Sequence, residues 1–437
     1  MTGWRPTASL GRASALGALG LVLALAAGRP ALAAFAVPLL LHAAWGITGK
    51  PLSGPRVQHH LDHRTLFEGQ ATTSRLELSA EGAEHVVRAM GQAAHVAVSP
   101  RSGAVQALLH GGRPRPAHDL DTGLPLHLGL RHWGLATLGE EKVAFTSEWC
   151  GFRWGPASLG HASLTVLPSR LPGSVLAPAP HPVGLVGAHR SRRIGSGVEM
   201  SGIRPFTVGD KLRRIHWRHS LRTGELHTIV SDAEEDAAVL LVVDATADHG
   251  CSGGVGDTES TLDVSVRAAA QIAEHHLRIG DRVGLRVVGG GGAVIPLSTG
   301  TRHSYRILGA LARTRPAPVG RGELSRLVLR APPGTVVLAL TPLLDPHVAD
   351  VAAFAARSGH DVVVVDTMPV RAEPVLDDPL EPPMADLVWR LRRLDRGPVI
   401  RALRRAGCPV VPWSGPGTLD LVLREMSHTR TRRPVVR

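Results

Sequence analysis

Two long runs of apolar residues lie within the first fifty positions. They cover residues 8–27 and 31–47, and Gly28, Arg29 and Pro30 interrupt the apolar pattern between them. Each run is close to the length of about 17 to 25 residues that crosses the hydrocarbon core of a bilayer, and Gly and Pro favour a break between helices. The pattern therefore predicts a transmembrane helical hairpin within residues 1–50.

Basic residues lie on both sides of this predicted hairpin, at Arg5, Arg12, Lys50, Arg56 and Arg64. The turn between the two runs holds Arg29 alone. Because positively charged flanks tend to remain in the cytoplasm, the pattern predicts a multi-pass protein of the cell membrane whose soluble domains are cytoplasmic.

A cleaved signal peptide is the alternative for this segment. Ala31, Leu32 and Ala33 resemble a cleavage site that follows a basic start and an apolar run. Cleavage there would leave the apolar residues 35–47 at the beginning of a soluble protein, so the hairpin is the favoured interpretation.

Between residues 55 and 170 the apolar positions alternate in short runs that Gly, Pro and His-rich turns separate. This alternation is typical of strands with one buried face, and it predicts an antiparallel β-sandwich. We expect the core of the sandwich to contain Trp133, Phe145, Trp149, Phe152 and Trp154. Residues 171–195 are rich in proline and lack periodicity, which indicates a linker.

The pattern changes again in residues 236–437. Short β-branched runs, at residues 237–243, 282–288, 334–340 and 360–366, alternate with helical periodicity such as that of residues 258–280, which stops at Gly280. This order favours a doubly wound α/β domain with a parallel sheet. In such sheets the binding crevice lies at the carboxyl ends of the strands, where Asp244 and Asp366 fall. The chain then ends in a basic tail.

Composition changes this picture little. The formal charge is +12, but lysine occurs only at Lys50, Lys142 and Lys211, so all but three of the 49 basic residues are arginine, as a GC-rich genome would produce. Only a local cluster of arginines therefore argues for an anionic partner. The three cysteines are widely spaced and form neither a disulfide framework nor a thiolate zinc motif, which suits a cytosolic compartment.

Residues 196–235 combine arginines, aromatic residues and a Gly-Asp turn. Asp210 is expected to cap a short helix that begins at Lys211. The pattern resembles the signature of bacterial domain-of-unknown-function family fifty-eight, with Phe206 where Tyr is more usual. The matching residues are Arg204, Phe206, Gly209, Asp210, Arg213 or Arg214, Ile215, Trp217, Ser220, Arg222, Gly224 and Leu226.

The resemblance implies a membrane-anchored protein with an N-terminal hairpin, a β-sandwich and a von Willebrand factor A-like domain. It further implies a non-enzymatic scaffold or adaptor that works with a MoxR-type AAA+ ATPase in protein assembly or maturation, near transglutaminase-like membrane proteins. No catalytic residue is implied, and the sequence offers no Gly-x-Ser-x-Gly elbow or Cys-His signature.

Many von Willebrand A-like domains hold Mg²⁺ through Asp-x-Ser-x-Ser with a Thr and an Asp from other loops. This chain has Asp244, Thr246 and Asp248 at the corresponding positions, with Thr299 or Thr301 as a further candidate ligand. Asp248 replaces a hydroxyl, and Pro342 follows Thr341 where the family would have an Asp. We therefore expect no cofactor, with Mg²⁺ as the less favoured alternative.

The signature segment has two interpretations. In the favoured one, its arginines and Asp210 form a hydrogen-bonded seam between the two soluble domains, with Ile215 and Trp217 buried beneath it. In the other, it is a docking surface for an acidic partner or a phosphate. A nucleic-acid-binding membrane protein is the functional alternative, disfavoured because few aromatic residues are available for base stacking.

Overall fold

The structure is a computed structural model of the 437-residue chain. It describes residues 3–79, 83–91, 96–100, 115–116, 125–168, 190–207, 210, 212–234, 238–289, 292–319, 331–332, 334–369, 382–418, 421–422 and 424–425. The predicted linker lies mostly outside these residues, as does the basic tail at residues 428–437. Contacts divide the chain into two units, the first consisting mainly of Met1–Ser169 and the second of most of the remainder.

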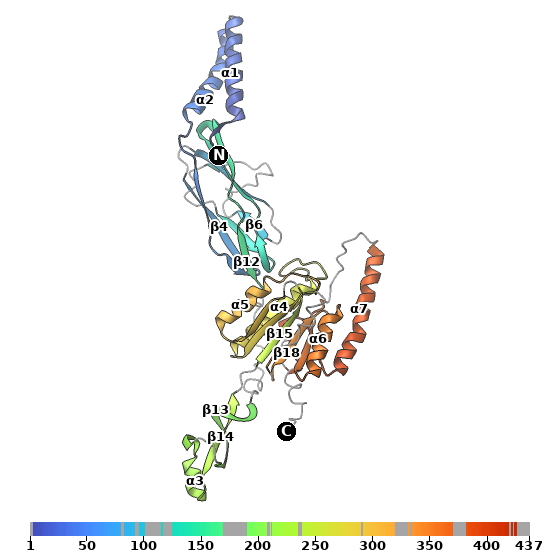
Figure 1. The fold of residues 1–437 in the computed structure, drawn as a ribbon. Coiled ribbons are helices and arrows are strands. Elements are labelled where there is room, and N and C mark those ends of the chain that lie inside the picture. The colour runs from blue at the N-terminus through green and yellow to red at the C-terminus, as the bar shows by residue number, and fades with distance from the viewer. Residues whose placement is uncertain are drawn as a thin grey trace. The chain divides into compact units, whose positions relative to one another are not determined.

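The first unit begins with the two predicted helices, α1 (Ala8–Ala26) and α2 (Ala33–Thr48), which the short 3₁₀ turn Pro30–Leu32 connects (Figure 1). Both are long and apolar enough to cross a membrane by length and composition. Small residues let the helices approach closely, since a Cβ on Gly17 would lie 2.8 Å from Leu40 Cγ. The outward-facing apolar side chains, such as Phe35, remain exposed.

The short segment before α1 connects the helices to the β-rich part of the same unit. Strand β1 (Arg5–Pro6) pairs with β11 (Phe152–Ser158). Thr7 then caps α1, and its hydroxyl donates to the carbonyl of Cys150 at 2.6 Å. Thr7 N–H donates to the carbonyl of Gly151 at 3.0 Å. The base of the helical pair is therefore fixed to the end of a sheet by backbone and side-chain bonds.

The alternating residues form three sheets that are mainly antiparallel. Their strands are β2 (Arg56–Leu61), β3 (Thr65–Phe67), β4 (Ala71–Ser79), β5 (Ala83–Met90), β6 (Val96–Pro100), β7 (Arg115–Pro116), β8 (Leu126–Leu130), β9 (Gly134–Thr137), β10 (Glu141–Ser147), β11 and β12 (Ser163–Leu167). The strand orders are β1-β11-β10-β5-β7, β2-β4-β8-β6 and β3-β12-β9, and among the described pairs of these three sheets only β3–β12 is parallel. Buried clusters draw side chains from two sheets at a time, as with Leu128 of β8 and Val166 of β12.

Four of the five predicted aromatic core residues are buried, namely Trp133, Phe145, Phe152 and Trp154. The prediction is wrong for Trp149, which is 49% exposed. Trp149 lies in the 3₁₀ turn η4 (Glu148–Cys150) with a positive φ of 57°, outside the alternation of the strands. Its ring stacks on Trp45 of α2, with centroids 5.1 Å apart.

The second unit contains the signature segment and the α/β domain. We call residues 190–234 the arm. It consists of β13 (Arg190–Pro205), the 3₁₀ turn η5 (Leu212–Arg214), α3 (Trp217–Thr223) and β14 (His227–Glu234), and β13 pairs antiparallel with β14. Because β13 begins at Arg190, the last residues of the predicted linker belong to a strand.

The α/β domain has one six-stranded sheet in the order β17-β16-β15-β18-β19-β20. Its elements are β15 (Ala238–Asp244), α4 (Thr261–Arg278), β16 (Arg282–Val288), β17 (Val294–Ser298), α5 (Thr301–Leu311), β18 (Val336–Thr341), α6 (Pro346–Arg357), β19 (Asp361–Asp366), α7 (Pro382–Arg405) and β20 (Val410–Pro412). The prediction of a wholly parallel sheet is wrong at one edge, where β17 runs antiparallel to β16. A glycine-rich turn joins these two strands directly, and such a short connection permits only antiparallel pairing.

The central strands are buried on both faces, as their continuous apolar sequences predicted. Val242, Val337 and Val364 pack in one cluster with residues of α6 and α7. Their neighbours along the strands, including Leu241 and Leu338, are equally buried and point to the opposite face, against which α4 lies. Because helices cover both faces of the sheet, polar side chains gather at the carboxyl ends of its strands.

Candidate functional site

Arg204 and Asp210 form the central ion pair of the arm. Arg204 Nη2 donates to Asp210 Oδ1 at 2.6 Å, and Thr207 N–H donates to Asp210 Oδ2 at 3.0 Å. The Arg204 hydrogen bond is the main cause that lowers the pKa of Asp210. Among the described residues, all hydrogen-bond partners of these two side chains lie between residues 204 and 210. The pair therefore closes a local loop, and the seam between the two soluble domains stays a prediction.

The predicted helix cap at Asp210 is also wrong. Helix α3 begins at Trp217, and His216 is its N-cap, with Nδ1 accepting from His219 N–H at 3.0 Å. Asp210 lies before η5 and uses its carboxylate on Arg204 and Thr207 instead. The guanidinium is a stronger partner for a carboxylate than exposed helical amides are.

Three other signature residues hold α3 against β14. Ile215 is buried, forms an isolated bridge with Thr228, and precedes the helix. Ser220 is also buried; its hydroxyl donates to His216 O at 3.1 Å and accepts from His227 N–H at 2.9 Å. Gly224 ends the helix at φ 79°, a left-handed conformation that strongly favours glycine. These residues build the arm.

Three signature side chains, Trp217, Arg222 and Leu226, are exposed to solvent, and so are their neighbours Leu212, Arg218 and Leu221. Trp217 is 61% exposed, so the prediction that it is buried is wrong. The helix has seven residues and packs through the side of Ser220, which leaves the side of Trp217 uncovered. We call the exposed set the tip surface: Leu212, Trp217, Arg218, Leu221, Arg222 and Leu226.

Two predicted residues are described in part or not at all. Gly209 is outside the described residues, and for Arg213 only the backbone, in η5, is described. Arg214 belongs to the same turn, and its carbonyl accepts from the Thr228 hydroxyl at 3.3 Å. It therefore contributes a backbone bond to the arm.

A second candidate site lies at the carboxyl end of β15. Asp244 is 3% exposed, and its Oδ1 accepts from the backbone N–H of Thr246 at 3.1 Å and from the Thr246 hydroxyl at 2.6 Å. Its Oδ2 accepts from the hydroxyl of Thr341, at the end of β18, also at 2.6 Å. Burial raises the pKa of Asp244, while these hydrogen bonds oppose the shift.

Asp248 does not join Asp244 in this site. Its Oδ1 accepts from Leu262 N–H at 3.0 Å and from the Thr261 hydroxyl at 3.2 Å, at the N-terminus of α4. Burial raises the pKa of Asp248 as well. The exposed candidates Thr299 and Thr301 flank the start of α5, and Thr341 is the hydroxyl beside Asp244 instead. The predicted metal ligands are therefore divided among separate structural bonds.

The neighbouring strand end holds an ion pair that the sequence did not indicate. Arg396 extends from α7, donates from Nε to Pro342 O at 2.8 Å, and pairs with Asp366 at the end of β19. Burial raises the pKa of Asp366, and the Arg396 charge opposes this. A fixed protein cation thus occupies the place where a cationic ligand would meet Asp366.

Comparisons with known proteins give a family match that covers most of the arm and much of the α/β domain. Residues 202–375 match the model of a family described as "Protein of unknown function DUF58". Uncharacterized proteins of Mycobacterium bovis and Mycobacterium tuberculosis are 28% identical over 252 residues, a match that covers 52% of this chain and 78% of each relative. A solved structure of an uncharacterized membrane spanning protein from Vibrio fischeri covers 44% of this chain and 98% of its own, at 16% identity. Its TM-score of 0.17 gives no basis for comparing the folds.

Proposed function

Because residues 202–375 form a domain of the DUF58 family, we propose that this protein is a membrane-anchored, non-enzymatic adaptor for a MoxR-type AAA+ ATPase in protein assembly or maturation. In this proposal α1 and α2 span the cell membrane as a hairpin, with both soluble domains in the cytoplasm. A β-sandwich and a von Willebrand A-like domain follow the hairpin, and a transglutaminase-like membrane protein is a candidate client.

The exposed tip surface of the arm is the observation that carries the proposal. Trp217 and Leu221 are four residues apart on α3, so both side chains lie on one face of the helix, and they are 61% and 82% exposed. Arg218 and Arg222 are exposed beside them. Tryptophan and arginine are the residues that most often dominate binding energy at protein interfaces. The tip surface therefore suits a partner that offers an apolar pocket with acidic residues at its rim.

The internal bonds of the arm support the same interpretation. Ile215, Ser220 and Gly224 fix α3 on β14, and the Arg204–Asp210 pair closes the loop before it. A rigid support lowers the entropy lost when a surface binds its partner. The signature thus contains one set of residues that builds the arm and another set that the arm presents.

We propose further that the strand ends of the α/β domain work without a metal ion or a catalytic group. The Asp244 carboxylate is engaged by Thr246 and Thr341, and that of Asp366 by Arg396. A Mg²⁺ site needs near-octahedral oxygen ligands around an open position. Here the hydroxyls of Thr246 and Thr341 donate to the carboxylate, and Asp248 caps α4.

The test is crosslinked affinity purification of the full-length, detergent-solubilised protein from its native host, with and without Mg²⁺. The informative variant is Trp217→Ala/Leu221→Ala, which removes the apolar part of the tip surface and leaves Ile215 and Ser220 in place. Phe354→Ala is the matched control, because Phe354 is 50% exposed on α6 of the same domain.

The proposal expects an AAA+ ATPase to co-purify with the wild type and with Phe354→Ala, and to be lost from the double variant. Equal recovery with all three proteins would refute the tip surface as the docking site. Recovery of nucleic acid in place of an ATPase, with loss in Arg222→Glu, would refute the adaptor and support anion binding. Dependence on Mg²⁺ would contradict the metal-free strand ends.

A further inference from the structure

Strand β5 contains an irregularity that brings two neighbouring side chains to one place. In the antiparallel pair of β5 and β10, His85 lies opposite Thr146, whereas Ala83 lies opposite Ser147. Glu84 is therefore the additional residue of a β-bulge. Successive side chains of a regular strand point to opposite faces, and a bulge redirects one of them. As a result, Glu84 and His85 form a pair at 3.7 Å between Nδ1 and Oε2.

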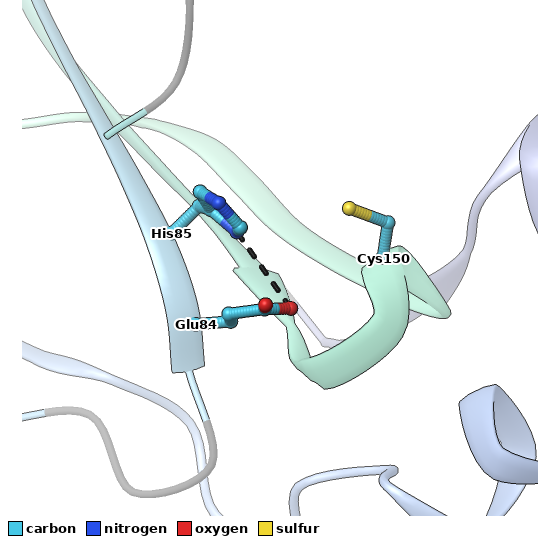
Figure 2. Close-up of side chains that lie close together, drawn as sticks. All are labelled: Glu84, His85 and Cys150. Atoms are coloured by element: carbon cyan, nitrogen blue, oxygen red, sulfur yellow. Dashed lines mark ion pairs between the residues drawn. The ribbon is translucent and has the colours of Figure 1, made fainter. Parts of the chain in front are cut away.

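The turn after β10 brings a third side chain to this pair. Cys150 ends η4, and its sulfur, the Glu84 carboxylate and a ring nitrogen of His85 all lie within 4.8 Å of one another. Figure 2 shows that the three side chains surround a common space, with Glu84 and His85 extending from the strand and Cys150 from the turn. Two segments that are 65 residues apart thus contribute to one cluster.

The backbone of the turn holds an unusual conformation at this point. Trp149 and Cys150 both have positive φ, 57° and 53°, which costs free energy for residues other than glycine. The N–H of Trp149 donates to Glu84 Oε2 at 2.9 Å, so the strained turn also orients the carboxylate. Such a hydrogen bond to a carboxylate is what positions ligands around protein metal sites.

The imidazole of His85 has an unsatisfied atom in the same space. Its Nδ1 is buried and has no hydrogen-bond partner within the described part of the chain. Buried polar atoms are rarely left without a partner. A metal ion bound to Nδ1 would satisfy this atom.

From this geometry we propose that Glu84, His85 and Cys150 form a binding site for Zn²⁺. Thiolate, imidazole and carboxylate are the ligand types that zinc takes, at about 2.3 Å for sulfur and about 2.0–2.2 Å for nitrogen and oxygen. Tetrahedral ligands at these lengths lie roughly 3.3–3.7 Å apart. The His85–Glu84 distance of 3.7 Å is within a few tenths of an ångström of this spacing, and the sulfur of the exposed Cys150 has room to approach them.

Binding of Zn²⁺ at this site releases one proton. The Cys150 thiol gives its proton to the buffer as sulfur binds the cation, and His85 binds through the lone pair of Nδ1 with its proton on Nε2. Burial, with a smaller contribution from the Glu84 charge, raises the pKa of the Cys150 thiol, so without a cation this sulfur stays protonated. Three protein ligands leave a fourth position for water or another ligand.

The site would link the ion to the base of the helical pair. Trp149, next to Cys150, stacks on Trp45 of α2, and Thr7 at the start of α1 donates to the carbonyl of Cys150. A bound ion would fix the turn that both helices contact. This inference does not depend on the adaptor function, because its residues lie outside the arm and the α/β domain.

The experiment uses the full-length protein in detergent, purified without a polyhistidine tag, and titrated with Zn²⁺ or Co²⁺ alone. We expect one metal ion per chain, and a thiolate-to-cobalt charge-transfer band with Co²⁺. Zn²⁺ should slow alkylation of Cys150, while Cys251, the other exposed cysteine, serves as the internal control.

The variants Cys150→Ser and His85→Gln should weaken binding at least tenfold, and Cys150→Ser should remove the charge-transfer band. Cys251→Ser should bind as the wild type does. Co²⁺ binding without a thiolate band, or equal affinity in Cys150→Ser, would overturn the proposal. If a variant fails to fold, the alkylation of wild-type Cys150 still decides: equal rates with and without Zn²⁺ would overturn it.

Discussion

The buried ion pair of Arg88 and Glu141 allows a quantitative test of the β-rich region. Arg88 is 0% exposed and Glu141 is 3% exposed. The guanidinium contacts Glu141 Oε1 through two nitrogens and donates to the carbonyl of Ser74 at 3.0 Å. Burial lowers the pKa of Arg88, and Glu141 is the partner that keeps its charge favourable. The perturbation is Glu141→Gln, which keeps the size of the side chain and removes its charge.

The loss of one partner from a buried pair typically costs about 3–5 kcal/mol, because the other charge remains buried without compensation. A pocket of about 190 Å³ lined by His59, Arg64 and Glu141 adjoins this network. Water in this pocket would moderate the penalty, so we expect a cost near 3 kcal/mol, the low end of the range. For a unit of this size, 1 kcal/mol shifts the melting temperature by about 2–4 °C, which predicts a fall of roughly 6–12 °C.

The assay combines thermal unfolding of the detergent-solubilised protein with hydrogen exchange of β5 and β10, which reports on this region by itself. The double variant Arg88→Met/Glu141→Leu removes both charges and should recover at least half of the loss, since the unpaired charge is gone. The Ser74 carbonyl loses its donor in that variant, so recovery is incomplete. An unchanged melting temperature and unchanged exchange in Glu141→Gln would refute the reasoning.

Three further predictions concern other parts of the chain. Gly17→Leu should separate α1 from α2 and speed hydrogen exchange in both helices, because even a Cβ would lie 2.8 Å from Leu40 Cγ; Gly11→Leu, where a Cβ meets no atom within 4 Å, should leave exchange unchanged. Relative to the wild type, Asp244→Asn should gain stability in the α/β domain progressively as the pH rises above about 4, the usual pKa of aspartate. Since burial raises the folded-state pKa of Asp244, the contribution of its proton to stability is complete below the unfolded-state pKa and is lost as the pH rises through the folded-state pKa. A constant difference in melting temperature across that range would contradict this sign. If the Arg204–Asp210 pair acts only within its loop, Arg204→Ala should leave the melting temperature nearly unchanged and increase exchange only around residues 204–210, whereas a sharp fall is what the seam between domains predicts.

Local features of the chain were predictable from the sequence. The two apolar helices, the strand that ends at Asp244, and α4 with its stop before Gly280 all follow from periodicity, chain length and glycine, which act over a few residues. The same holds for the location of the signature segment. Helix α7 was not predicted, because Pro398 and several arginines obscure its apolar periodicity.

The tertiary structure decided which side chains meet. The sequence determined that Trp217 and Arg204 belong to one motif, but not that Trp217 is exposed or that Arg204 pairs within its own loop, since burial depends on what packs against a helix. Likewise, the register of β5 against β10 places Glu84 in a bulge beside Cys150. Strand register and bulges are set by partner strands distant in the chain, so the proposed zinc ligands leave no spacing motif in the sequence.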